Sequence, residues 1–194
     1  MGKGADTRGM ILDRALSLAS TEGLEQLTIG LLAKAVGMSK SGLFAHFKSK
    51  EQLQLSVLEA ASERFVRGVI SPSLKEPRGE PRVQALFDHW LEWEAAFPGG
   101  CPYQTAIIEF DDRPGVVRDY LLETQRDWQD ALTQAARIAV DEGHFRADLE
   151  PKTFAFQFTC LAIGYYQHKH LYRDGTSKTL TRKAFDQLLD SARA

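Results

Sequence analysis

The sequence predicts an all-α protein, on three observations. Apolar residues recur at intervals of three and four along most of the chain, which is the period of an amphipathic helix. Glycine and proline clusters separate these segments, and no segment alternates convincingly between apolar and polar residues as a half-buried strand does. The pattern predicts about nine helices in 194 residues, 43% of them hydrophobic, which suits one or two domains with a sizeable core.

Charge is distributed unevenly along the chain. Residues 1–50 contain seven lysines and arginines and four acidic residues, a net charge of +3. The whole chain carries −2, so the remainder carries −5. A basic N-terminal end on an acidic body indicates that any contact with nucleic acid is confined to that end.

Residues 28–50 organise the N-terminal region and contain no Asp or Glu. Thr28 is expected to cap a short helix that Gly37 ends, because glycine adopts the left-handed conformation without steric cost. Ser39 is expected to cap a second, shorter helix. Two short helices around a glycine form a helix-turn-helix, in which the second helix can lie in the major groove of DNA. The alternative is an ordinary helical hairpin, but a surface without carboxylates favours contact with phosphates.

The remaining helices follow from the same signals. A first helix is expected from Thr7 to Ser20, after a loose tail at residues 1–6. A fourth is expected from Lys50 to about residue 69, opened by a cap at Ser49. After a proline-rich break at residues 71–81, further helices are expected at about 82–97, 103–110, 117–143, 151–172 and 177–192.

The domain organisation predicted from these helices has two parts. Residues 1–50 form a helix-turn-helix DNA-binding domain, followed by a linking helix over residues 50–70. Residues 71–194 form a second helical domain.

The helix expected over residues 151–172 is apolar on two sides. One stripe contains Phe154, Phe158, Leu161 and Tyr165, and a second contains Phe156, Cys160 and Ile163. A helix that is apolar around most of its circumference must be covered on more than one side. The core of its own domain supplies one cover, and we expect a second copy of the chain to supply the other. The last helix is expected to present Leu180, Ala184, Leu188 and Ala192 on one side.

Several function classes are not supported by the sequence. It contains no run of about 18 apolar residues for a membrane span, and no apolar region of a secretory signal follows the N-terminus. Cys101 and Cys160 are far apart and form no CxxC pair, so a cytoplasmic protein with reduced thiols is expected. No zinc signature, phosphate-binding glycine loop or nucleophile elbow is present. We therefore expect no enzyme activity, no cofactor and no metal.

The motif LTIGLLAKAVGMSKSGLFAHFKSKEQL strongly resembles the DNA-binding head of the tetracycline-repressor (TetR) family of transcriptional regulators. The resemblance is specific over residues 7–66, and over the body it is one of architecture and length. It implies a three-helix DNA-binding head and an all-helical body in which residues 71–194 serve effector binding and dimerisation. It also implies a homodimer built by the last two helices of each subunit, and a pocket for a small-molecule effector.

The resemblance also implies a set of residues that contact double-stranded DNA: Thr28, Ser39, Lys40, Ser41, Gly42, Phe44, His46 and Lys50. Thr28, His46 and Lys50 are expected to bind phosphates, the last aided by a helix dipole. Lys40 is the expected base reader, because lysine reaches the acceptors of guanine. The family often has tyrosine at the position of Phe44. Without the hydroxyl, this side chain either touches a thymine methyl or packs in the core.

The body is rich in aromatic residues, for which two interpretations remain open. They can line a pocket for a hydrophobic or planar effector, with the walls expected at Trp90, Trp93, Trp128 and Phe158. They can also simply fill the core, as aromatic residues at helical spacing commonly do.

These observations predict a dimeric transcriptional regulator, a repressor that binds a palindromic operator and is released by a small hydrophobic effector. One alternative is a regulator with the same head that responds to a protein partner or to redox state. A lesser alternative is a small helical enzyme in which the basic helix pair is only structural.

Overall fold

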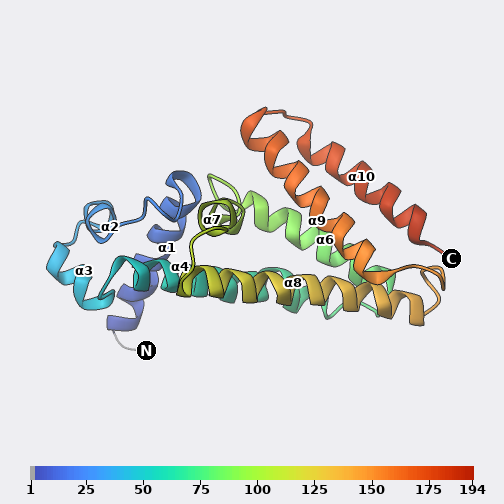
Figure 1. Cartoon of the computed structure of the whole chain (residues 1–194), viewed down its shortest axis with the longest axis horizontal. Helices are drawn as coiled ribbons and strands as arrows, with labels where there is room; N and C mark the ends of the chain where they lie inside the picture. The colour runs from blue at the N-terminus through green and yellow to red at the C-terminus, as the bar shows by residue number, and fades with distance from the viewer. Residues whose placement is uncertain (1–2) are drawn as a thin grey trace. The chain divides into compact units, whose positions relative to one another are not determined.

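The computed structural model describes residues 3–194, with side chains from residue 7, and over these residues the chain is helical without a strand. Nine helices have seven residues or more, as the sequence predicted, and Figure 1 shows their arrangement along the chain. They are α1 (Lys3–Glu22), α2 (Ile29–Val36), α3 (Lys40–His46), α4 (Lys50–Phe65), α6 (Glu80–Ala95), α7 (Pro102–Phe110), α8 (Val116–Asp141), α9 (Pro151–Tyr166) and α10 (Ser177–Ala192). Two π-helical turns, η1 (Val66–Ile70) and η2 (Gln167–Leu171), and the short α5 (Ser71–Ser73) complete the list.

The signals that delimit the short N-terminal helices act as expected. The hydroxyls of Thr28, Ser39 and Ser49 each accept a hydrogen bond from the backbone N–H three residues on, at 3.0–3.1 Å. Gly37 ends α2 in the left-handed conformation, with φ at 67°. Each cap satisfies one of the backbone amides in the first turn that a helix cannot satisfy internally.

Two boundaries differ from the sequence-based expectation. Helix α1 begins at Lys3, so residues 3–6 are helical where a loose tail was expected, while residues 1–2 lie outside the described residues. The break expected from residue 71 begins later, because α4, η1 and α5 follow one another without interruption to Ser73. Pro72 lies in this run at the start of α5, directly after the π-helical turn η1, where the regular hydrogen-bond pattern of the helix has already changed.

The chain divides into two compact units, which we describe separately. The first unit comprises residues 3–65 and 95–123, and within it α7 packs against α1 and α4. The hydroxyl of Tyr103 in α7 donates to the carbonyl oxygen of Leu58 in α4 at 2.9 Å. The helix-turn-helix is therefore held in one compact unit with a helix from far along the chain.

The loop before α7 packs closely on the end of α1. A Cβ placed on Gly99 would lie 1.7 Å from the carbonyl oxygen of Ser20 and 2.3 Å from its carbonyl carbon. Such contacts are far inside van der Waals distance, so only glycine fits without moving the backbone. This close approach fixes the loop against the end of α1.

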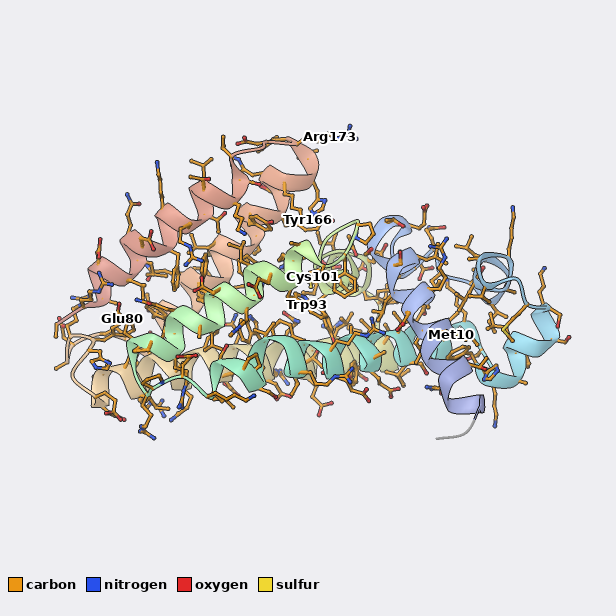
Figure 2. All side chains as sticks on the ribbon, turned by 180° about the vertical axis from the view of Figure 1, so that it is seen from behind. Met10, Glu80, Trp93, Cys101, Tyr166 and Arg173 are labelled. Atoms are coloured by element: carbon orange, nitrogen blue, oxygen red, sulfur yellow. The ribbon has the colours of Figure 1, made fainter. Side chains whose placement is uncertain are left out.

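The second unit comprises residues 66–94 and 124–194. Helices α9 and α10 lie side by side in it and run in opposite directions (Figure 1), joined by a turn around Arg173, which Figure 2 labels. Phe87 of α6 stacks on Phe185 of α10 with ring centroids 3.8 Å apart, and Phe158 of α9 meets Phe87 edge to face at 5.7 Å. Aromatic rings from three helices therefore form the centre of this unit.

Helix α9 is apolar on two sides, as its sequence predicted. Phe154 and Phe158 are each only 1% exposed and lie in the core of the unit. Phe156 is 66% exposed and Ile163 is 49% exposed, and the exposed Cys160 belongs to the same stripe. Among the described residues, nothing covers this second stripe.

The four residues expected on one side of α10 are buried to different degrees. Leu188 and Ala192 are buried, whereas Leu180 is exposed and Ala184 is half-buried. Phe185 and Leu189 are also buried, so they form the buried face of the helix together with Leu188 and Ala192. Within the part of the chain that the structure describes, no helix combines the length and the apolar character that a membrane crossing requires.

Candidate nucleic-acid interface

Helix α3 is anchored by two fully buried side chains. Leu43 and Phe47, four residues apart, are inaccessible to solvent, as their spacing predicted. Lys40, Ser41 and Phe44 are all exposed. The helix therefore presents one side to the core of the unit and the other, with the expected base-reading residues, to solvent.

The N-terminus of α3 is held by a small hydroxyl network. Ser39 Oγ accepts from the backbone N–H of Gly42 at 3.1 Å and lies 3.1 Å from Ser41 Oγ. A Cβ on Gly42 would lie 3.1 Å from the same Ser39 oxygen. Three of the four residues expected to face base edges, Ser39, Ser41 and Gly42, thus also belong to the capping network of the helix, so their structural role and their expected DNA-contacting role overlap.

Lys40 lies against the beginning of α2. Its Cε is 3.3 Å and its Nζ 3.6 Å from the position that a Cβ of Gly30 would occupy. Thr28 Oγ1 lies 3.9 Å from that same position. The ammonium group therefore lies between the solvent-facing side of α3 and the capped N-terminus of α2, where anions are favoured.

Phe44 is 54% exposed, so the interpretation that it packs in the core is wrong. A phenyl ring on the solvent side of α3 leaves apolar area available for a base-edge methyl group. His46, at the end of the same helix, is half-buried, and its ring lies 6.2 Å from that of Phe47.

Lys50 is engaged in an ion pair that the sequence did not predict. Its Nζ lies 3.0 Å from Glu25 Oε1, and Arg113 Nη1 lies 3.3 Å from the same oxygen. The hydrogen bond from Lys50, opposed in part by desolvation, lowers the pKa of the Glu25 carboxyl. Glu25 lies three residues before the acid-free stretch and Arg113 lies in a distant loop. Only the fold brings the three charges together.

The residues expected to line an effector pocket lie in the second unit. Phe158 meets Trp90 at 6.2 Å and Trp128 at 5.9 Å, both edge to face. Trp93, one turn beyond Trp90 on α6, is buried, and Trp128 is half-buried. Three of the four side chains, Trp90, Trp128 and Phe158, are therefore in contact, an arrangement that also serves as a packed core.

Among the described residues, no group of three or more His, Cys, Asp or Glu side chains is placed to hold a metal ion.

Fold and site together define a class of protein, the helical transcriptional regulators that bind DNA through a helix-turn-helix. Residues 11–57 match the family described as "Bacterial regulatory proteins, tetR family", and residues 79–185 match "Tetracyclin repressor-like, C-terminal domain". The chain therefore belongs to the TetR family of DNA-binding transcriptional regulators.

Individual relatives agree with this assignment. The HTH-type transcriptional regulator TcmR of Streptomyces glaucescens is 26% identical over 196 residues, covering 96% of this chain and 83% of its own. A TetR transcriptional regulator from Chloroflexus aurantiacus J-10-FL has the same fold, with a TM-score of 0.82 and 23% identity over 98% of this chain and 96% of its own. AibR, solved in complex with isovaleryl coenzyme A and operator DNA, has a TM-score of 0.75 at 22% identity, covering 94% of this chain and 97% of its own.

Proposed function

We propose that this protein is a homodimeric transcriptional repressor that binds a palindromic operator and is released from it by a small hydrophobic effector. The observation that carries the proposal is the solvent-facing side of α3, where exposed Lys40, Ser41 and Phe44 stand on a helix fixed by buried Leu43 and Phe47. No carboxylate lies between residues 28 and 50 to repel a phosphate. A rigid, acid-free helix of this kind suits the major groove.

The proposed roles of the contact residues follow from their positions. Ser39, Lys40, Ser41, Gly42 and Phe44 face base edges from the first turns of α3. Thr28, His46 and Lys50 bind phosphates around them and fix the register of the protein on the duplex, as phosphate contacts do in general. Residues 1–50 form the DNA-binding domain in this proposal, with residues 50–70 as the linking helix.

Dimerisation is proposed to occur through α9 and α10 of the body, residues 71–194. The exposed side chains of Phe156, Ile163 and Leu180 support this, because an apolar stripe without a cover in its own chain is suited to an isologous contact with a second copy. Such a dimer presents two α3 helices, which on a palindromic operator lie about 34–36 Å apart, one turn of B-DNA.

The effector is proposed to bind in the body, among aromatic side chains that include Trp90, Trp93, Trp128 and Phe158. The aromatic composition of the second unit supports a hydrophobic or planar molecule. The complex of AibR with isovaleryl coenzyme A and operator DNA supports a ligand-responsive mechanism in a protein of this fold. The effector shifts the protein between two states by its differential affinity for them, typically about 1–3 kcal/mol of coupling. Such a repressor acts in the cytoplasm.

Selection of genomic fragments by the purified protein, read by sequencing, tests the proposal and identifies the operator. Lys40→Ala is expected to relax the base preference at one position of each half-site. Lys50→Ala is expected to weaken binding to all sequences similarly and to reduce the salt slope by about one per subunit. Recovery of no enriched sequence, with no binding to any duplex at low salt, would overturn the proposal.

A further inference from the structure

Glu25 places a negative charge directly on one of the lysines proposed to bind DNA. Its Oε1 lies 3.0 Å from Lys50 Nζ and 3.3 Å from Arg113 Nη1, so one carboxylate is shared by two cations. All three side chains are partly exposed. We call Glu25, Lys50 and Arg113 the ion triad, and all three belong to the first compact unit.

The backbone that carries Glu25 is held rigidly. The backbone N–H of Glu25 donates to Glu109 Oε2 of α7 at 3.1 Å. One residue earlier, the carbonyl oxygen of Leu24 accepts from Gln54 Nε2 of α4 at 3.0 Å, in a buried position. Glu109 Oε1 also lies only 2.1 Å from the position that a Cβ of Gly23 would take, so the side chain of Glu109 packs directly on this turn. The backbone position from which the Glu25 carboxylate extends is therefore fixed by α4 and α7.

Lys50, in contrast, is free to change partner. Its ammonium group stands on a flexible four-carbon side chain and donates in three directions. The triad borders a cavity of about 220 Å³ lined also by Glu51, Gln54 and Arg118, so the side chains can move without repacking a core. A DNA phosphate and the Glu25 carboxylate are both anions with oxygen acceptors, and a single ammonium group close to one is less available to the other.

We infer that Glu25 is an autoinhibitory competitor of the DNA phosphate for Lys50, and that Arg113 sets the strength of this competition by holding the Glu25 carboxylate. The inference rests on the proposed function. When Lys50 turns to a phosphate, Glu25 keeps one cation at its oxygen instead of being left unpaired. If Arg113 is drawn away, Lys50 becomes the main partner of Glu25 and is withheld from DNA.

Arg113 is well placed to receive a signal from the rest of the chain. It lies in the loop between α7 and α8, three residues before α8 begins at Val116. Helix α8 continues without interruption to Asp141, so its first turns belong to the first unit and its later turns to the second. A displacement of the beginning of α8 changes the distance between Arg113 and Glu25, and with it the availability of Lys50.

The test compares single variants in binding to a labelled mixed-sequence duplex of about 30 base pairs, long enough for two half-sites one turn apart. At about 50 mM salt, binding of this probe reports phosphate contacts and does not require the operator. Glu25→Gln is expected to tighten binding about fivefold per subunit. This factor corresponds to about 1 kcal/mol, the upper value for an exposed ion pair, which Lys50 no longer loses when it turns to a phosphate. Arg113→Ala is expected to weaken binding, although Arg113 itself is not a proposed DNA contact.

Two controls separate the ion triad from the general effect of charge and from damage to the fold. Glu51→Gln removes the same charge from the residue next to Lys50 and is expected to change affinity much less. In a Lys50→Ala background, Glu25→Gln is expected to lose most of its effect, as a double-mutant cycle measures. Loss of a purely structural ion pair lowers both the melting temperature and the affinity, so a gain in affinity is diagnostic of competition.

The outcomes are distinguishable. Absence of any binding by the wild-type protein at low salt overturns the proposed function. Binding by the wild-type protein that Glu25→Gln leaves unchanged or weakens, or an equal gain with Glu51→Gln, overturns the inference alone. Unchanged affinity in Arg113→Ala overturns the role given to Arg113.

Discussion

Ser39 offers the sharpest test of the interface, because its role as a helix cap can be separated from its position facing DNA. Its Oγ accepts from the N–H of Gly42 at 3.1 Å and lies 3.1 Å from Ser41 Oγ, and the side chain is exposed. Ser39→Ala removes the cap from a helix of only seven residues. Loss of an N-cap costs about 1 kcal/mol, which for a chain of this size corresponds to about 2–4 °C in melting temperature.

Ser39→Asp and Ser39→Asn restore the cap with different charges. Both side chains cap as well as serine, and the aspartate gains further from the helix dipole, so both variants are expected to melt at or above the wild-type temperature. On DNA they are expected to differ. A carboxylate at the N-terminal end of α3 would lie against the base edges and close to the phosphates that flank them, and like-charge contacts cost several kcal/mol. Ser39→Asp is therefore expected to bind at least about 100-fold more weakly than Ser39→Asn, since 2.7 kcal/mol is a factor of 100.

Melting followed by circular dichroism and binding followed by fluorescence anisotropy measure the two effects on the same samples. Ser39→Ala should lose stability, Ser39→Asn should keep both properties, and Ser39→Asp should keep stability alone. Ser39→Asp that binds DNA as tightly as the wild-type protein would refute the docking of α3 by its N-terminal end.

Three further predictions concern two exposed side chains, Phe44 and Phe156, and one half-buried side chain, His170. Phe44→Ala is expected to change stability by less than about 0.5 kcal/mol, because the ring is 54% exposed, but to reduce the preference for thymine in selected fragments; an unchanged preference would exclude the methyl contact. Phe156→Glu on the outer stripe of α9 is expected to give a folded monomer in analytical ultracentrifugation, and a persistent dimer would place the interface elsewhere. Burial lowers the pKa of the His170 imidazole, so below about pH 6.5 the unfolded chain takes up a proton that the folded chain resists, and the free energy of unfolding decreases. His170→Asn is expected to make this decrease shallower in urea titrations at several pH values, and an equally steep decrease would contradict the assignment.

Much of the fold was accessible from the sequence because it depends on local signals. The caps at Thr28, Ser39 and Ser49 and the left-handed glycine at residue 37 act within three or four residues of their own positions. The apolar period of each long helix is likewise a property of a short window. These signals determined the number of helices and most of their boundaries.

The limits of some helices were less accessible because continuation depends on neighbours. Pro72 was interpreted as the beginning of a break, but it occupies the first turn of α5, where helical geometry continues from Ile70. On α10, Phe185 is buried although it lies outside the apolar side noted from spacing, because its ring stacks on Phe87 of α6. Both decisions depend on packing between segments.

The candidate interface shows the same division. The order and chemical types of residues 28–50 were sufficient to assign α3 as the DNA-facing helix, since burial of Leu43 and Phe47 follows from helical spacing. The sequence left two interpretations of Phe44 open, and exposure of its ring removed one of them.

The sequence by itself therefore determined an all-helical regulator with a basic, capped helix pair at its N-terminal end. Tertiary structure alone decided which charges meet: Glu25, Lys50 and Arg113 come from three segments, and their pairing depends on α7 packing against α1 and α4. The physical reason is range. Caps and apolar periods act over a single helical turn, whereas an ion pair at 3.0 Å requires distant segments to be fixed in space by the packing of everything between them.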